Sequence, residues 1–423
     1  MAIIAQLGAL LLSATILLTG NGLQTTLLPL RAEAEAFPAL SIGIMGSSYF
    51  IGFVVGCLTT AHLVRPVGHI RVFTAMVAIA SVVPLLHILT LQEWAWWILR
   101  AVTGYCIAAL FLVIESWLNE RADNTMRGTV FSVYTTLTFV AIICGQILLT
   151  LYEPTEFTLF AVASIVVSLA AVPIALTSAT APAPLATVRL HPIRLVRLSP
   201  AGAVGCFAVG LVNGAFWSLA PIFATSAGFD ATGVATFIGV AVLGGALSQW
   251  PFGRLSDRLD RRAVILLVSG LSVVTGLGLF LASRYWSPGV LPLAFAFGAF
   301  SFPVYAISVA HVNDLITTQS FVEVSGGLLL LNGVGSVLGP VAGAFAMQLA
   351  GPGALFAEIA LVYVLFAAFI LLRMRDQARP AETHSADFVP AVDSAIAAPV
   401  GYDPRSEETP EPPLKEPEES IVR

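Results

Sequence analysis

Charged residues are scarce in this sequence. Only 11% of its 423 residues are Asp, Glu, Lys or Arg, whereas soluble globular proteins carry about 25%. A water-exposed surface is built largely from such residues, and the 20 basic and 25 acidic ones present cannot cover the chain as soluble domains. The sequence therefore predicts a protein whose missing polar surface faces lipid.

Cysteine is also sparse, and it lacks the spacing of a disulfide scaffold or a metal site. The four cysteines, Cys57, Cys106, Cys144 and Cys206, each lie in a long apolar run, and none forms a Cys-x-x-Cys pair. No nucleotide-binding P-loop is present, so ATP-driven pumping would need a partner. We expect no cofactor and no bound metal.

The net charge of −5 is unevenly distributed. Residues 376–423 hold 11 acidic and 4 basic residues, a net −7, so the other 375 residues carry 16 basic and 14 acidic residues, a net +2. The segment 376–423 is rich in Pro and Glu and poor in large apolar residues, which predicts a disordered cytoplasmic tail. The overall acidity argues against a nucleic-acid partner.

Long apolar runs dominate the rest of the chain, and a run of about 20 apolar residues crosses a bilayer as a helix. The runs are continuous rather than alternating, which excludes a membrane β-barrel. The sequence predicts an all-α polytopic protein with twelve spans, at 3–29, 40–63, 70–91, 94–117, 128–151, 156–178, 200–224, 231–252, 263–283, 288–311, 324–349 and 353–373.

The arginines predict the orientation of these spans. With the N-terminus inside, fourteen arginines fall on the cytoplasmic side and only Arg31 and Arg284 on the other. This distribution predicts that both termini are cytoplasmic.

The polar stretch 179–199 divides the spans six and six, and residues recur across it. Asn21, Gly22 and Pro29 recur 192 residues later, as does Gly52, whereas Gly104, Asn119 and Gly145 recur 194 residues later. A duplicated six-helix unit would leave such a pattern, with the substrate site between the halves. We expect a bundle at 1–178, a cytoplasmic linker at 179–199, a second bundle at 200–375 and the tail at 376–423.

One loop carries a recognisable motif. GRLSDRLDRR, at 253–262, resembles the loop signature G-x-L-(S/A/D)-D-R-x-G-R-R of the major facilitator superfamily, with Asp260 in place of the second Gly. The resemblance implies a gating role for Gly253, Asp257, Arg258, Arg261 and Arg262; the alternative is that the arginines only mark the cytoplasmic side. Arg100, Thr103 and Gly104 resemble the superfamily's R-x-x-(Q)-G signature in the fourth helix.

Three further segments resemble the YcaD-type branch of bacterial facilitators: GNGLQTTLLPLRAEAEAF (20–37), VGHIRVFTA (67–75) and ESWLNERADNTMRGTVFSVY (115–134). The resemblance covers residues 1 to about 375. It implies a bacterial inner-membrane transporter with two pseudo-symmetric six-helix bundles, but names no substrate.

Polar residues within the spans are the candidate site. Arg100 lies roughly 10 Å inside the fourth helix, and a guanidinium that deep usually faces a cavity or a partner, unless it extends back to the interface. Asn21, Gln24, Asn213 and Trp217 lie at similar depth in the first and seventh helices and are candidates to line a substrate cavity. The amides alternatively only bridge helices.

Glu115, His311 and Asp314 are candidates for proton coupling or gating, and the resemblance to related transporters implies a role in proton coupling or substrate handling for Arg100. Carboxyl groups in a low-dielectric setting titrate nearer to neutral pH, and histidine titrates there already. The alternative is that Glu115, His311 and Asp314 only contact Arg121, Arg127 or water.

The sequence therefore predicts a monomeric secondary transporter that exports a small organic molecule in exchange for protons, with lipid as its surroundings. Two alternatives remain open. The first is an intramembrane enzyme, because Asn313-Asp314 resembles the start of the N-D-x-x-D motif of intramembrane prenyltransferases, although position 317 is Thr. The second is a transport-inactive sensor that signals through the acidic tail.

Overall fold

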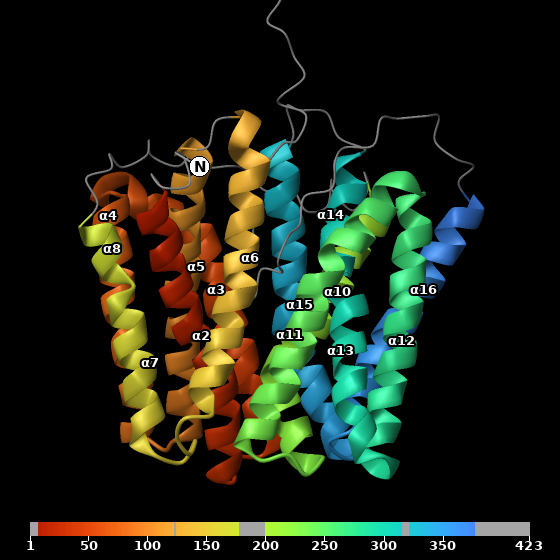
Figure 1. The fold of residues 1–423 in the computed structure, drawn as a ribbon, viewed down its shortest axis with the longest axis horizontal. Coiled ribbons are helices and arrows are strands. Elements are labelled where there is room, and N and C mark those ends of the chain that lie inside the picture. The colour runs from red at the N-terminus through yellow and green to blue at the C-terminus, as the bar shows by residue number, and fades with distance from the viewer. Residues whose placement is uncertain (1–6, 122–123, 177–198, 315–320, 377–423) are drawn as a thin grey trace, which may run out of the picture.

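In the computed structural model, residues 7–121, 124–176, 199–314 and 321–376 are described, and every regular element among them is a helix (Figure 1). The first half contains α2 (Gly8–Ala34), α3 (Ala39–Val67), α4 (His69–Leu89), α5 (Glu93–Arg121), α6 (Asn124–Leu149), α7 (Phe157–Leu169) and the short α8 (Ala171–Ala175). The second half contains α10 (Pro200–Ser226), α11 (Ala231–Arg258), α12 (Arg261–Tyr285), the 3₁₀ turn η1 (Ser287–Gly289), α13 (Val290–Ser301), α14 (Pro303–Asn313), α15 (Phe321–Ala350) and α16 (Ala354–Asp376).

The predicted all-α architecture of twelve spans is confirmed, with α7–α8 and η1–α14 each counting as one span. Eleven of the described helices are long and apolar enough to cross a membrane. α2 is not among these eleven, and Asn21 and Gln24 interrupt its apolar run. The predicted linker 179–199 and tail 376–423 lie outside the described residues, apart from Ser199 and Asp376.

The tenth span contains one local interruption of its helical hydrogen bonds, at Pro303, where α13 ends and α14 begins. The backbone itself stays helical through Phe302, with φ −68° and ψ −35°. Proline has no N–H to continue the helical hydrogen bonds, and it is well tolerated at the start of a new helix.

Two acidic side chains begin helices of the second half. Asp230 accepts a hydrogen bond from the N–H of Gly233 at the start of α11, and Asp260 accepts one from the N–H of Arg262 at the start of α12. Each satisfies a backbone donor that the first turn leaves free. The departure of the loop motif at Asp260 therefore has a structural reason.

The helices stand side by side, with the first half on the left of Figure 1 and most of the second half on the right. The ends near Gly68 and Asp260 are at the top of the figure, and the ends near Ala39 and Gly351 are at the bottom. We call these the upper end and the lower end.

Equivalent glycines pack equivalent helices in the two halves. A Cβ on Gly52 of α3 would collide with the carbonyl oxygen of Ala101 in α5, and one on Gly244 of α11 with that of Phe295 in α13. Gly104 and Gly298 make the reciprocal approaches. Small residues allow such close helix packing within a membrane. Residues that recur at offsets of 192 and 194 thus have the same packing role in each half.

The two halves meet along α3 and α15. A Cβ on Gly43 would lie 2.6 Å from the carbonyl oxygen of Pro340 and 2.7 Å from the Cβ of Ala344. Ser47 donates a hydrogen bond of 2.6 Å to the carbonyl oxygen of Val337. Gly43 and Ser47 lie in the first third of α3, so these contacts hold the halves together toward the lower end.

Candidate functional site

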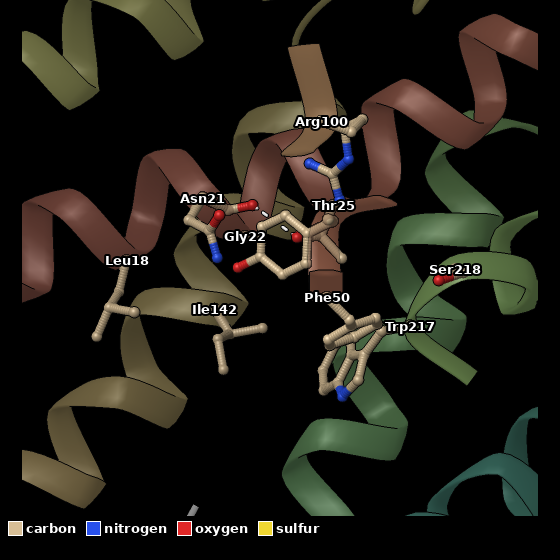
Figure 2. A pocket seen from close by; sticks show the side chains of 10 residues that line it. Leu18, Asn21, Gly22, Thr25, Phe50, Arg100, Ile142, Trp217 and Ser218 are labelled. Carbon is tan, nitrogen blue, oxygen red and sulfur yellow. Dashed lines mark hydrogen bonds between the residues drawn. The ribbon is translucent and has the colours of Figure 1, made fainter. Parts of the chain in front are cut away.

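A pocket lies between the two halves, above the lower-end contacts of α3 and α15. Its lining residues come from five helices: Leu18, Asn21, Gly22 and Thr25 from α2, Tyr49 and Phe50 from α3, Arg100 from α5, Ile142 from α6, and Trp217 and Ser218 from α10. Three of the predicted cavity residues, Asn21, Arg100 and Trp217, are therefore brought together. Figure 2 shows Arg100 and Trp217 on opposite sides of the pocket, with Asn21 on α2 to one side of both.

Arg100 carries the only charge in this lining, and its side chain is buried rather than extended to the lower end. The residue is 5% exposed, and its guanidinium carbon lies 4.4 Å from the centre of the Tyr49 ring. Nε and Nη1 are both buried and have no hydrogen-bond partner among the described residues. The arginine thus has a π-face beside it but no described carboxylate to balance its charge.

Gln146 of α6 positions the α2 side of the pocket. Its amide nitrogen donates a 3.1 Å hydrogen bond to the carbonyl oxygen of Gly22, and its amide oxygen accepts a 2.9 Å bond from Thr26. Gly145 lets the two backbones approach, because a Cβ there would lie 2.6 Å from the nitrogen of Leu23. These contacts fix the part of α2 that presents Asn21, whose side-chain oxygen is buried without a hydrogen bond among the described residues.

The other two predicted cavity residues lie outside the pocket lining. Gln24 is buried, and its amide nitrogen lies 3.4 Å from the carbonyl oxygen of Gly20 in its own helix. Asn213 is also buried, one helical turn before Trp217. Spacing along a helix places Asn213 and Trp217 near one face, but only Trp217 reaches the pocket.

Aromatic residues form the opposite wall. The Trp217 ring lies 5.9 Å from that of Phe302 and 5.3 Å from that of Phe216, and the Phe50 ring lies 5.3 Å from that of Tyr49. Sequence reasoning missed Tyr49, Phe50 and Ser218, since they lie in apolar runs like many core residues. Ring contacts with Phe216 and Phe302 thus hold Trp217 in this wall.

The loop motif forms an ion-pair network at the upper end. Nε of Arg261 lies 2.7 Å from Oδ2 of Asp314, and Nη2 lies 3.3 Å from Oδ1 of Asp257. The Arg261 side chain is 3% exposed. Two predicted groups, the loop 253–262 and the end of the tenth span, are therefore in direct contact.

The remaining motif residues differ in exposure. Gly253 and Arg262 are buried, whereas Arg258 is exposed. His311 is buried on α14, within electrostatic range of Arg262 and Asp260. The structure thus places His311 beside the loop motif.

Glu115 lies apart from both the pocket and the loop motif. It is 1% exposed and interacts electrostatically with Cys57 of α3 and Tyr134 of α6. It is therefore buried inside the first half, rather than at the water boundary. In the described part of the chain, no group of three or more His, Cys, Asp and Glu side chains is arranged to hold a metal ion.

Comparison with known proteins agrees with this architecture. The family model of the major facilitator superfamily matches residues 10–326 and 202–395. The chain is 27% identical over 374 residues to the uncharacterized MFS-type transporter YcaD of Escherichia fergusonii, covering 88% of this chain and 97% of the relative. It is 25% identical over 357 residues to an uncharacterized MFS-type transporter of Yersinia enterocolitica, covering 83% and 91%.

Solved structures share the fold at low sequence identity. A mutant form of the nucleoside transporter NupG has a TM-score of 0.76 at 13% identity, covering 87% of this chain and 99% of that one. A bacterial homologue of the human lysosomal transporter Spinster has a TM-score of 0.70 at 14% identity, covering 90% and 99%. With its long apolar helices, this chain is an integral membrane protein and a secondary transporter that belongs to the major facilitator superfamily.

Proposed function

We propose that the protein exports a small organic molecule from the bacterial cytoplasm in exchange for protons, by alternating access. The observation that carries this proposal is the pocket between the two halves, beside the α3–α15 contacts that hold one end closed. A site between duplicated halves can be opened to either side when the halves rock about it.

The arginine distribution supports assigning the upper end to the cytoplasm. Arg65, Arg71, Arg258, Arg373 and Arg375 all lie at or near upper helix ends, whereas Arg31 and Arg284 lie near lower ones. By the positive-inside rule, the closed lower end then faces the outside. We propose that the protein sits in the inner membrane as a monomer, with both termini cytoplasmic, and that it acts on no nucleic acid.

Proton exchange requires groups that gain and lose protons during the cycle. Glu115, His311 and Asp314 are the titratable candidates, and the Arg261–Asp314 ion pair gives one of them a partner whose contact can change as the upper end closes. We propose that Arg100 acts at the pocket and that these groups act toward the upper end. The protein is proposed to have no enzymatic activity.

Transport into liposomes tests the proposal. Purified protein is reconstituted, and accumulation of a panel of radiolabelled organic acids, amines and neutral compounds is followed while a trapped dye reports internal pH. Vesicles with an acidic lumen represent the outside, so at least one compound should accumulate while the lumen loses protons. Accumulation that requires an alkaline lumen would contradict exchange, and no accumulation of any compound above protein-free vesicles would contradict transport of such molecules.

A further inference from the structure

We propose that the transported molecule is a small organic anion, whose carboxylate binds Arg100 and whose apolar body packs against Phe50 and Trp217. This inference rests on the proposed function and specifies its substrate class. It follows from Arg100, the one charged side chain of the pocket lining. Among the described residues, this side chain lacks a counter-charge, and two of its nitrogens lack a hydrogen-bond partner.

The charge on Arg100 has no compensating negative charge in the described structure around it. A guanidinium stays protonated in proteins, and a buried charge is strongly unfavourable without a counter-charge or hydrogen bonds. On α5 itself the nearest acidic residues are Glu93 and Glu115, about 10 Å and about 22 Å away along the helix axis. Neither belongs to the pocket lining.

Other arginines of the described structure show what a satisfied guanidinium looks like here. Arg261 pairs with Asp314 at 2.7 Å and with Asp257 at 3.3 Å, and none of its nitrogens is buried without a partner. Arg254 is exposed and stacks over the Trp250 ring at 3.8 Å. Arg100 is buried like Arg261, yet two of its nitrogens lack any partner among the described residues. A ligand anion would supply the contacts that are missing.

The rest of the lining favours an anion with an apolar body rather than an inorganic ion. Polar groups gather on the α2 side, where Asn21 and Thr25 lie near the arginine (Figure 2). The α10 side presents Trp217, which is 7% exposed and held by its aromatic neighbours. Such a division into a charged end and an aromatic wall is typical of sites that orient amphipathic molecules.

The charge of the substrate also fixes the electrical character of the exchange. If one monoanion leaves for each proton that enters, two positive charges move inward per cycle. An inside-negative membrane potential then accelerates export. For a neutral substrate, only one charge would move.

A matched ligand series tests the inference: 3-phenylpropionate, its neutral amide and 3-phenylpropylamine have nearly the same shape but charges of −1, 0 and +1. Exchange of each is measured in proteoliposomes, and binding is measured as the ligand-induced rise in melting temperature of the detergent-solubilised protein. We expect wild type to prefer the anion about 10- to 100-fold, the size expected for hydrogen bonds to a charged group. A potassium diffusion potential, negative on the cytoplasmic side of the protein, should accelerate export of the anion.

Three variants locate the preference. Arg100→Gln should abolish it, Arg100→Lys should restore part of it, and Arg254→Gln, which removes an exposed arginine outside the pocket, should leave it unchanged. Equal or better transport of the amide or amine by wild type overturns the anion assignment and leaves the transporter intact. If none of the three moves faster than through protein-free vesicles, and none raises the melting temperature of folded protein, the anion assignment is contradicted, whereas the transport proposal fails only if no compound of the broader panel accumulates either.

Discussion

Gly43 is the position where a single added side chain should shift the balance between the two access states. A Cβ there would lie 2.6 Å from the carbonyl oxygen of Pro340, whereas ordinary van der Waals contact begins near 3.4 Å. Gly43→Val therefore forces α3 and α15 apart by roughly 0.8 Å, the difference between these distances, unless the lower end opens. The obstructing atom belongs to the backbone, so it cannot rotate away as a flexible side chain would.

The size of the expected shift between the two access states follows from the free-energy cost of overpacking this contact. Inserting methyl groups into a tightly packed contact costs about 1–3 kcal/mol. In the state with an open lower end this contact is absent, so Gly43→Val should raise the open-to-closed ratio by about 5- to 150-fold, which is the same free energy expressed as a ratio. Gly43→Ala should give a smaller shift in the same direction.

Pulsed electron–electron resonance measures this ratio directly. Spin labels are placed on cysteines at Ala34 of α2 and Ser226 of α10, both exposed at the lower end, in a chain whose four native cysteines are replaced. We expect a longer-distance population that grows with Gly43→Val. Gly270→Val is the control, because a Cβ at Gly270 meets nothing within 4 Å. An unchanged distance distribution in Gly43→Val would refute the assignment of this contact as the closure of the lower end.

Further predictions concern the upper end, the pocket scaffold and the orientation. Arg261→Met should destabilise the protein by about 3 kcal/mol, because Asp314 and Asp257 both lose their contact with the buried guanidinium, whereas Asp314→Leu should cost less because Arg261 keeps its contact with Asp257. The double variant should lose less than the sum of the two single variants; chemical unfolding in detergent measures this, and additive losses would contradict it. Gln146→Leu should lower stability by about 1–3 kcal/mol by leaving the Gly22 carbonyl and Thr26 without their bonds. Gln146→Glu keeps an acceptor for Thr26 but loses the donor to Gly22, so equal losses in the two variants would show that the bond from Thr26 contributes little. An impermeant maleimide should label Ala34→Cys only from outside intact cells and Arg258→Cys only from the cytoplasmic side; labelling of both from one side would refute the orientation.

Most of the fold was predictable because the thickness of the hydrocarbon core of the membrane fixes the length of each span. The predicted span 231–252 lies within α11, which continues six residues further to Arg258, and 40–63 lies within α3, which continues four residues further to Val67. What the apolar run could not reveal is the effect of Pro303, since a proline within a membrane helix either bends it or ends it according to its neighbours. Here the backbone stays helical through Phe302.

The site was predictable only in part. Asn21, Arg100 and Trp217 are polar or amphipathic residues in apolar surroundings, so their chemistry marks them. Tyr49 and Phe50 become pocket residues through the approach of α3 to α2 and α10, and no local pattern distinguishes them from core residues. Gln24 and Asn213 were predicted to line the cavity because they are polar, but both are buried outside its lining. Their placement also depends on how the helices pack and not on a local pattern.

Contacts between residues far apart in the sequence could not be predicted from the sequence either. Arg261 and Asp314 are 53 positions apart, and their ion pair depends on how α12 packs against α14. Glu115 lies near the end of a span by sequence, yet α3 and α6 cover it. Burial of such groups is set by neighbouring helices, which spacing within one helix does not describe.

Reciprocal access to the pocket is the most direct test of the account. A single cysteine at Thr25, a pocket residue that is only partly buried, is labelled with an impermeant maleimide in right-side-out and in inside-out vesicles. We expect reaction from both sides, with Gly43→Val raising the rate from outside and lowering the rate from the cytoplasmic side. Reaction from one side only, unaffected by Gly43→Val, would contradict alternating access and with it the proposed transport cycle.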